Sequence, residues 1–359
     1  MQTRIRHKTG LLLVLLLLLS LNLSGCRLTY LLHAAAGQAK LLSGAVPMED
    51  GLQDATLSDQ KKDRLRLVPH IKAFGERTLG LKETKNYEKI YLASSRPPVY
   101  VISACPKDRL APVTWWFPIV GRMPYLGFFD LETARAEKDK LLAKDLDVSL
   151  GAAEAYSTLG WFRDPVTLNM IDDSTLDLVE TILHEMTHTT LYVKGQGLFN
   201  ESVAMLVGKI GALLFLEDFY GPGHPLTLEA RDSIEDERLF ASYIDALLEK
   251  LDSLYRTPIP FQTKLKQREK IFSETLDEFR RLRPKLKTDR FTGFGLVPLN
   301  NAYLLTIGLY HRHFHLFEEL FLEKGHDLKK TLVFLENLAA NEGDMIEKMR
   351  LELASKRNT

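Results

Sequence analysis

The chain has 359 residues, which is enough for one large domain or two smaller ones. Apolar residues make up 45% of it and charged residues 26%, values that are typical of a globular protein and exclude a disordered one. Basic and acidic residues balance to a formal net charge of zero. Because no broad basic field exists, the composition argues against nucleic acid as a partner.

The first residues form a segment of their own. Arg4, Arg6 and Lys8 precede an apolar run over residues 11–23. This run has the length of a secretory signal and is shorter than the roughly 20 apolar residues of a transmembrane helix. A signal peptide over residues 1–25 is therefore expected.

The signal segment ends in LSGC, which resembles the bacterial lipobox, where the cysteine is lipidated and becomes the new N-terminus. An uncleaved anchor, or an ordinary signal with an incidental cysteine, is the alternative, but the basic, apolar and LSGC parts together favour lipidation at Cys26. By resemblance to Gram-negative lipoproteins, Arg27 at the next position favours the outer membrane, facing the periplasm. If Cys26 carries lipid, Cys105 has no partner within the chain, and the protein must fold without disulfides.

The remaining residues predict a mainly helical chain with a small sheet. Strands are expected at 97–105 and 146–162, the second of which opens into a loop, and 114–120 is a further apolar stretch. Helices are expected at 28–42, 57–79 with an interruption at Pro69, 131–144, 174–193 and 200–220, and again through most of the chain beyond Gly223. The expected fold class is α+β, mainly helical, and residues 26–359 are expected to form a single domain.

The helix at 174–193 carries a pair of histidines. Apolar residues recur at helical spacing, and Ser174 is a plausible N-cap. Because residues four apart lie on one face, His184 and His188 can bind one zinc ion, with Glu185 close enough to reach a water molecule on it. The alternative is a helix with incidental histidines.

A third ligand decides between these readings, since a catalytic zinc needs three protein ligands and an open position. After the break at residues 194–197, Asn200 is the expected N-cap of the next helix and Glu201 lies in its first turn. The short loop would bring Glu201 back toward His184 and His188. An acid in a first turn is also favoured by the helix dipole alone, but together with the histidines a ligand is the better interpretation.

Four sequence blocks extend this pattern: AYSTLGWFRDP at 155–165, FNESVA at 199–204, TWWFPIVGRMPYLGFFD at 114–130 and LNNAYL at 299–304. With HEMTH at 184–188 they resemble a family of bacterial lipoproteins that are predicted aminopeptidases among the zincin-like metallopeptidases. The resemblance implies a zincin-like fold with a small sheet packed beside the HExxH helix. It also implies Zn²⁺ at His184, His188 and Glu201, with Glu185 as catalytic acid and base.

In zincins the strand before the metal helix pairs with extended substrate, so Glu154, Tyr156 and Ser157 are candidate substrate-binding residues. A buried core strand is the alternative. GAAEA at 151–155 is faintly similar to the motif that holds a substrate amine in some aminopeptidases, with Glu154 as its acid, but it lacks that motif's Met and Asn.

Gluzincins also supply a Tyr or His from their C-terminal half to stabilise the oxyanion. Tyr303, Tyr310 and His311 are the candidates, which sequence spacing does not separate, and Tyr310 is the one predicted to be catalytic.

The sequence thus predicts a zinc-dependent peptidase, by resemblance an aminopeptidase, that acts on peptides in the cell envelope and is held to the membrane by its N-terminal lipid. The alternative is a non-catalytic envelope lipoprotein that keeps zinc for structure or interaction. The natural substrate and the oligomeric state are not specified by any pattern in the sequence.

Overall fold

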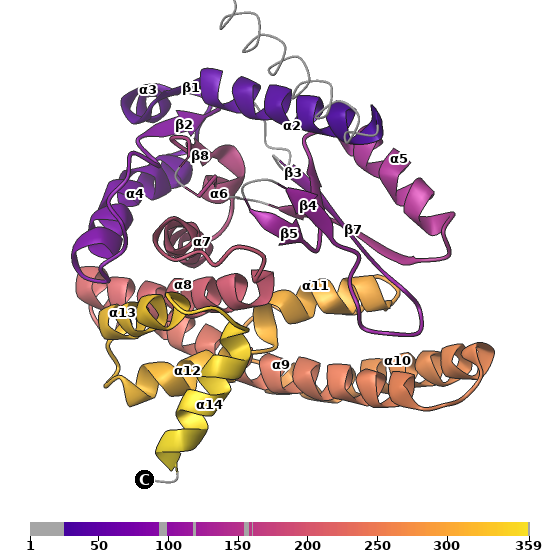
Figure 1. Ribbon diagram of the computed structural model, residues 1–359. Helices are drawn as coiled ribbons and strands as arrows, with labels where there is room; N and C mark the ends of the chain where they lie inside the picture. Colours follow the sequence, from indigo (N-terminus) through magenta and orange to yellow (C-terminus); the bar gives the residue numbers. More distant parts are fainter. Residues whose placement is uncertain (1–24, 93–98, 118–119, 154–157, 160, 358–359) are drawn as a thin grey trace, which may run out of the picture. The chain divides into compact units, whose positions relative to one another are not determined.

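The computed structural model describes residues 25–92, 99–117, 120–153, 158–159 and 161–357. The chain divides into two compact units, residues 1–44 and 45–359. Helix α2 (Gly25–Ser43) belongs to the first unit, and the other described elements belong to the second (Figure 1).

The strands of the second unit are short and form three small sheets. β1 (Ala45–Pro47), β2 (Lys89–Tyr91) and β8 (Val166–Thr167) make one sheet in the order β1-β2-β8. β6 (Leu126–Phe128), β3 (Val99–Cys105) and β7 (Asp147–Ala153) make an antiparallel sheet in the order β6-β3-β7. β4 (Trp115–Phe117) and β5 (Gly121–Met123) pair as a two-stranded sheet.

Helices form most of the second unit. In chain order they are α3 (Met48–Gln53), α4 (Asp59–Arg77), α5 (Leu131–Leu142), α6 (Leu168–Asp172), α7 (Thr175–Thr190), α8 (Gly197–Tyr220), α9 (Pro225–Arg256), α10 (Phe261–Leu282), the 3₁₀ turn η1 (Arg283–Lys285), α11 (Asn301–His311), α12 (Phe314–Glu323), α13 (Leu328–Ala339) and α14 (Met345–Arg357). The expected α+β, mainly helical fold class is confirmed.

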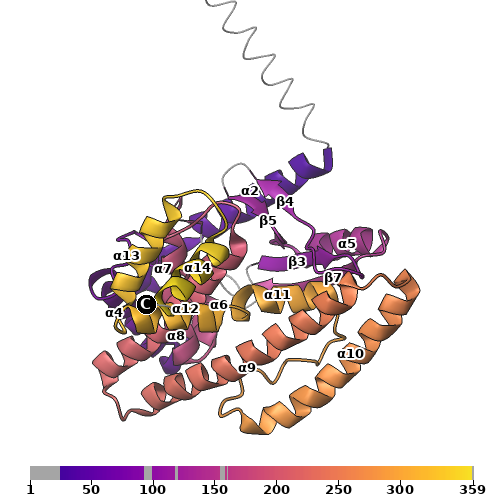
Figure 2. The same ribbon diagram turned by 60° about the horizontal axis from the view of Figure 1, so that its bottom comes forward.

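Helix α11 joins the β6-β3-β7 sheet to the helical core. It contacts β3 and β7 on one side and α8 and α9 on the other. Figures 1 and 2 both show this sheet lying between α5 and α11. Ser103 on β3 supports the contact, since its hydroxyl lies 2.7 Å from the hydroxyl of Thr306 on α11.

Helix α4 differs from the sequence prediction at Pro69, which lies inside the helix and does not interrupt it. A proline within a helix removes one backbone hydrogen bond and costs about 3 kcal/mol. Leu65, Val68 and Ile71 are fully buried on this helix. Burying such side chains stabilises by about 1.5–3 kcal/mol each, which offsets the loss at the proline.

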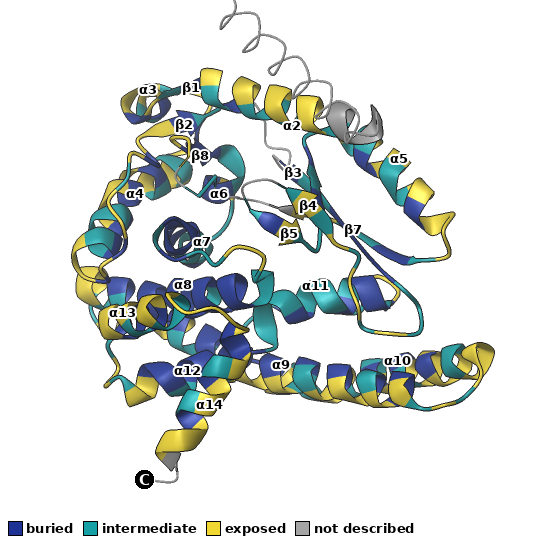
Figure 3. Cartoon of the chain, viewed as in Figure 1, coloured by how far each residue is buried: buried dark blue, intermediate teal, exposed yellow. Residues whose placement is uncertain are grey.

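Helices α7 and α8 lie at the centre of the main core, where Figure 3 shows both as largely buried. Helix α7 begins as its sequence predicts, because the Ser174 hydroxyl accepts a hydrogen bond from the backbone N–H of Asp177 at 3.0 Å. Among the described residues, α8 is the one helix long and apolar enough to cross a membrane, but 78% of its most apolar window is buried inside the protein. We therefore interpret α8 as a core helix, buried on all sides.

Helix α8 begins earlier than expected. Its first residue is Gly197 and Gln196 is at the cap position, so the prediction of Asn200 as N-cap was wrong. The side chain of Asn200 instead makes two hydrogen bonds to the backbone of Val193 in the preceding loop, a pair that we call the Asn200 bracket. Asn200 Oδ1 accepts from the Val193 N–H at 2.8 Å, and Asn200 Nδ2 donates to the Val193 carbonyl at 2.9 Å.

A second core lies between α9, α10 and α11 and the loop that follows η1. Aromatic rings dominate it: Phe240 stacks on Phe291 with centroids 4.0 Å apart and also contacts Phe279 and Phe294. Helix α9 contributes to both cores, with Ile234 and Ala241 in the first and Phe240 and Ile244 in the second.

Close approach of α7 and α8 depends on Gly208. A Cβ atom there would lie 3.0 Å from the backbone oxygen of Glu180 and 3.4 Å from Cβ of His184. Neither neighbour is the flexible end of a side chain, so a larger residue must push the two helices apart.

We expect Gly208→Val to lower the free energy of unfolding by about 1–3 kcal/mol, because overpacking forces backbone shifts. Denaturant titration followed by circular dichroism measures this. Gly223→Ala is the control, since no heavy atom lies within 4 Å of the added methyl group. Equal stability of the two variants would contradict the role of Gly208.

Candidate metal centre

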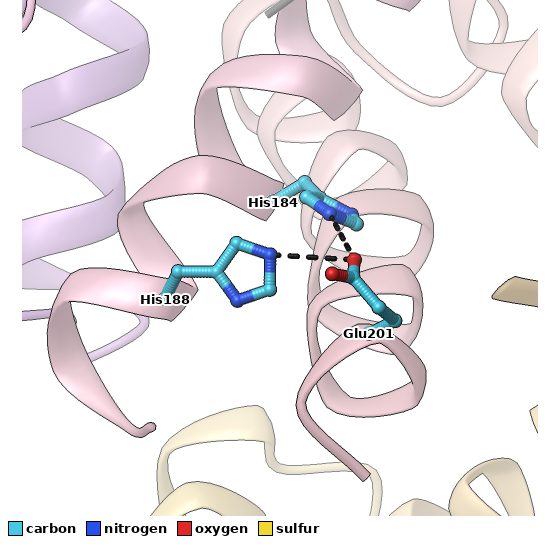
Figure 4. A group of neighbouring side chains, drawn as sticks. All are labelled: His184, His188 and Glu201. Carbon is cyan, nitrogen blue, oxygen red and sulfur yellow. Dashed lines mark hydrogen bonds and ion pairs between the residues drawn. The ribbon is translucent and has the colours of Figure 1, made fainter. Parts of the chain in front are cut away.

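Two helices supply a cluster of three potential metal ligands. His184 and His188 lie one turn apart on α7, and Glu201 lies on α8 (Figure 4). Glu201 Oε2 is 3.2 Å from Nε2 of His184 and 3.4 Å from Nε2 of His188. It is the one group of three or more His, Cys, Asp or Glu residues in the described part of the chain whose ligand atoms could hold a metal ion.

The spacing of these atoms fits a tetrahedral metal ion. Ligand bonds of about 2.0–2.2 Å to zinc place neighbouring ligand atoms of a tetrahedron about 3.3–3.6 Å apart. The two distances from Glu201 lie close to this range, and the three donor atoms lie within 4.8 Å of one another. Two imidazoles and one carboxylate are also the donor set of many catalytic zinc sites.

The cluster is buried, and its charges interact strongly. Burial alone would raise the pKa of the Glu201 carboxyl, but the charge of His188 and hydrogen bonds from both imidazoles hold this pKa well below its usual range. Burial would lower the pKa of His188, but the charge of Glu201 and its hydrogen bond raise it to about 8. The carboxyl of Glu201 is therefore held as an anion beside the two rings.

The loop between the helices brings Glu201 back to the histidines. Helix α7 ends at Thr190 with Leu191 in an extended conformation, and Gly195 has a φ of +77°, which favours glycine. The Asn200 bracket on Val193 fixes the turn. Because α8 begins at Gly197, Glu201 lies beyond the first turn, and attraction to the helix N-terminus explains its position less well than the contact with the histidines.

Glu185 follows His184 on α7 and is 8% exposed. Burial raises the pKa of its carboxyl, and the charges of His184 and His188 oppose this rise without cancelling it. Tyr87 and Asp164 interact electrostatically with this carboxyl. Glu185 thus lies beside the cluster in an environment that favours proton uptake.

Of the three candidate residues in the C-terminal half, Tyr310 lies at the cluster. Its ring centroid is 6.2 Å from that of His184, and the negative charge of Glu201, followed by burial and Glu185, raises its pKa well above the ordinary value. Tyr303 stacks near Phe294 in the second core, with centroids 6.2 Å apart. His311 points to Glu237, with its Nδ1 2.6 Å from Glu237 Oε1.

Two further tyrosines near the cluster were missed in the sequence. The ring of Tyr192 lies 6.5 Å from that of His188, and burial together with Glu201 raises the pKa of its phenol to about 12. Burial, Glu201 and Tyr310 raise the pKa of Tyr125 well above its ordinary value. Tyr125 belongs to the 114–130 block. The resemblance of that block to the family was the one sequence signal that could have placed Tyr125 near the site.

The hairpin of β4 and β5 is fastened to the segment after α7. The Tyr192 hydroxyl donates to the carbonyl of Val120 at 3.4 Å, and the Gly195 N–H donates to the same carbonyl at 3.2 Å. The Tyr192 hydroxyl also lies 3.4 Å from Sδ of Met123. Residues from the 114–130 block are therefore held next to the C-terminal end of α7, although they are far from it in sequence.

Asp164 is 5% exposed, interacts electrostatically with Glu185 and binds Thr158. The Thr158 N–H and hydroxyl donate to the Asp164 carboxylate at 2.8–2.9 Å, and the Asp164 N–H donates to Asn86 Oδ1 at 3.1 Å. The candidate substrate-binding residues Glu154, Tyr156 and Ser157 lie outside the described residues. Cys26 lies in α2 of the first unit, and its side chain is likewise not described.

A protein-family model described as "Putative aminopeptidase" matches residues 29–349. The chain belongs to this family. The resemblance inferred from the sequence blocks is thereby confirmed for an aminopeptidase family, whose description supports hydrolysis of peptides. Neither the curated proteins nor the solved structures contain a match to the chain.

The geometry predicts that the purified protein binds about one equivalent of a divalent metal ion per chain. His188→Ala and Glu201→Ala should each lose most of it, because a buried site with two ligands holds metal weakly. Elemental analysis after dialysis measures the metal content. His70→Ala is the control, since His70 is exposed and packs against Phe219. Full metal retention in both ligand variants would reject the site.

Proposed function

We propose that the chain is a zinc-dependent aminopeptidase of the zincin-like, gluzincin type, anchored in the bacterial envelope by a lipid on Cys26. The convergence of His184, His188 and Glu201, with ligand atoms within 4.8 Å of one another, is the observation that carries the proposal. Membership of an aminopeptidase family supports the reaction class.

Zinc, when bound by these three residues, would supply Lewis-acid activation of water and of the substrate carbonyl. Glu185 is the general base: its carboxylate accepts the proton of the attacking water and passes it to the leaving amine. Burial supports this role, because a carboxyl whose pKa is raised holds a transferred proton more readily.

Tyr310 is the residue proposed to stabilise the oxyanion. Its phenol lies on α11, across from α7, and its ring is close to that of His184. A protonated phenol donates one hydrogen bond, and such a donor is useful where negative charge develops on the substrate oxygen. Tyr303 and His311 face other partners, which supports Tyr310 over both.

Strand β7 is the proposed docking edge for the substrate backbone. Among the described strands it pairs with β3 alone, and its other edge is the one proposed to receive an extended peptide. Glu154, which follows β7 in sequence, is proposed to hold the free amine of the substrate, since a carboxylate is the natural partner of an ammonium group.

A rival proposal is a non-catalytic lipoprotein that keeps zinc for structure. Glu185 favours the enzyme, because a structural zinc site is closed by a fourth ligand and needs no base. The location in the outer membrane, facing the periplasm, is proposed from the LSGC segment and Arg27 alone.

Glu185→Gln should retain the fold and the metal but lower peptide hydrolysis by about 10²–10⁴-fold, because an amide cannot take up the proton of water. Assays on a peptide library, together with metal analysis, measure both quantities. Glu249→Gln, on an exposed position of α9, is the matched control. Near wild-type hydrolysis by Glu185→Gln would remove this residue from the mechanism.

Short peptides with a free N-terminus should be cleaved faster than the same peptides acetylated, because an aminopeptidase binds the ammonium group. Glu154→Gln should raise KM for the free peptide and narrow the difference, through loss of a charge-assisted bond worth about 1.5–3 kcal/mol. Equal cleavage of free and acetylated peptides would refute the aminopeptidase proposal and leave a zinc peptidase of another specificity.

The mature protein should begin at lipidated Cys26 and sediment with membranes, whereas Cys26→Ala should abolish lipidation and cleavage at the lipobox. Mass spectrometry of the N-terminal peptide tests this. An unmodified cysteine in the wild-type protein, or a mature N-terminus elsewhere, would disprove the anchor.

A further inference from the structure

A buried network of charged residues lies behind the metal centre. Glu180 on α7, Lys209 on α8, Glu237 on α9 and His311 on α11 form its centre. Arg290, in the segment after η1, also bonds to Glu180, and Ser233 on α9 bonds to Lys209. Lys209 Nζ is 3.4 Å from Glu180 Oε2 and 3.5 Å from Glu237 Oε2, and His311 Nδ1 is 2.6 Å from Glu237 Oε1. The Glu237 side chain has 0% exposure and that of Lys209 has 4%.

Three members of this network are close in sequence to residues of the candidate site. Glu180 lies one helical turn before His184, and Lys209 lies about two turns after Glu201 on α8. His311 directly follows Tyr310 on α11. Glu237, in contrast, is on α9, which carries none of the candidate site residues, and it contacts both Lys209 and His311.

Stability alone explains this network poorly. Removing charges from water costs several kcal/mol per ion, and replacing a buried ion pair by apolar residues of similar volume is often neutral or stabilising. Apolar packing already surrounds His311, whose ring lies 5.1 Å from that of Phe240 and 5.6 Å from that of Phe291. Apolar residues therefore already hold the His311 ring against α9. The directional bond to Glu237 adds a fixed orientation of that ring.

The remaining polar contacts of α11 hold mainly its first half. The Asn301 N–H donates to the buried carboxylate of Asp147 at 2.9 Å, and Thr306 contacts Ser103 on β3. At the other end, Arg312 bonds to Asp245 at 2.8 Å, but both side chains are partly exposed, and such pairs contribute little. Among the polar contacts at the end of α11 that carries Tyr310, the bond between His311 and Glu237 is therefore the buried one.

We propose that Glu237 is a positioning residue that, through His311, fixes the rotation of α11 and so places the Tyr310 phenol relative to His184 and Glu201. Lys209 on α8 contacts the same carboxylate and also Glu180 on α7. The Glu237 carboxylate therefore links α7, α8 and α11. The inference rests on the proposed function in so far as it concerns catalysis, but the placement of Tyr310 can be measured without activity.

The experiment compares His311→Asn with His311→Leu. The asparagine amide can occupy the position of Nδ1 and donate to Glu237, whereas leucine fills the same space without a donor. We expect His311→Leu to lower kcat by about 10–100-fold, because a misplacement of about 1 Å can cost 10²-fold. KM and zinc content should change little. The thermal midpoint of His311→Leu should fall, because the buried Glu237 carboxylate loses its hydrogen-bond donor, whereas His311→Asn should retain most of the wild-type kcat.

A second readout places the phenol directly. Fluorotyrosine introduced at position 310 should show a shifted or broadened ¹⁹F resonance in His311→Leu and a wild-type resonance in His311→Asn. His315→Leu is the matched control, because His315 on α12 bonds to α9 through Ser242 at 2.7 Å and through the carbonyl of Arg238 at 3.0 Å. It should change neither kcat nor the resonance.

Equal kcat and an unshifted resonance in folded His311→Leu would overturn the proposal. If His311→Leu does not fold, Glu237→Gln replaces it: loss of the charge should shift the resonance, and an unchanged resonance in that variant overturns the proposal. If the wild-type protein hydrolyses no peptide, the proposed function fails, while the resonances still decide whether Glu237 places Tyr310.

Discussion

Contact between α7 and α8 is the constraint on which the rest of the structure depends. Three polar side chains must converge to within a few ångströms inside an apolar core, and this requires two helix backbones to approach closely. Gly208 permits the approach beside His184, and the Asn200 bracket on Val193 closes the loop between the helices. Burying two imidazoles and a carboxylate is costly unless they are paired or bind a metal ion. The pairing among these groups therefore ties the site to the folding of the core.

The sequence predicted the parts of this arrangement that depend on local geometry. Spacing of four residues places His184 and His188 on one face of any helix, and the Ser174 cap depends on residues three positions apart. The start of α8 was misplaced because Asn200 has two uses, as a cap or as a bracket on a loop, and the sequence does not distinguish them. Pro69 was expected to interrupt α4, but burial of apolar neighbours far apart in sequence keeps the helix continuous.

Residues that reach the site from distant segments could not be predicted by spacing. Tyr303, Tyr310 and His311 were equivalent candidates, because which of them faces α7 depends on how α11 packs between the sheet and α8. Tyr125 and Tyr192 were missed for the same reason. The pair Glu237 and His311 is separated by 74 residues, and neither belongs to a recognisable motif. Local patterns therefore define the candidate metal ligands, whereas tertiary packing defines their surroundings.

Sharing of one long helix by two cores has a consequence for local unfolding. Helix α9 has 32 residues and contributes apolar side chains to the core around α7 and α8 and to the aromatic core beneath α10. Proteins open in cooperative units whose free energies differ, and a unit bounded by one shared element can open while the rest stays folded. The turn between α9 and α10 can thus fray while the amide protons of α7 stay protected from exchange. The same turn can accept an insertion in the course of evolution. Amides in the middle of α9, which border both cores, would exchange only when the whole unit unfolds.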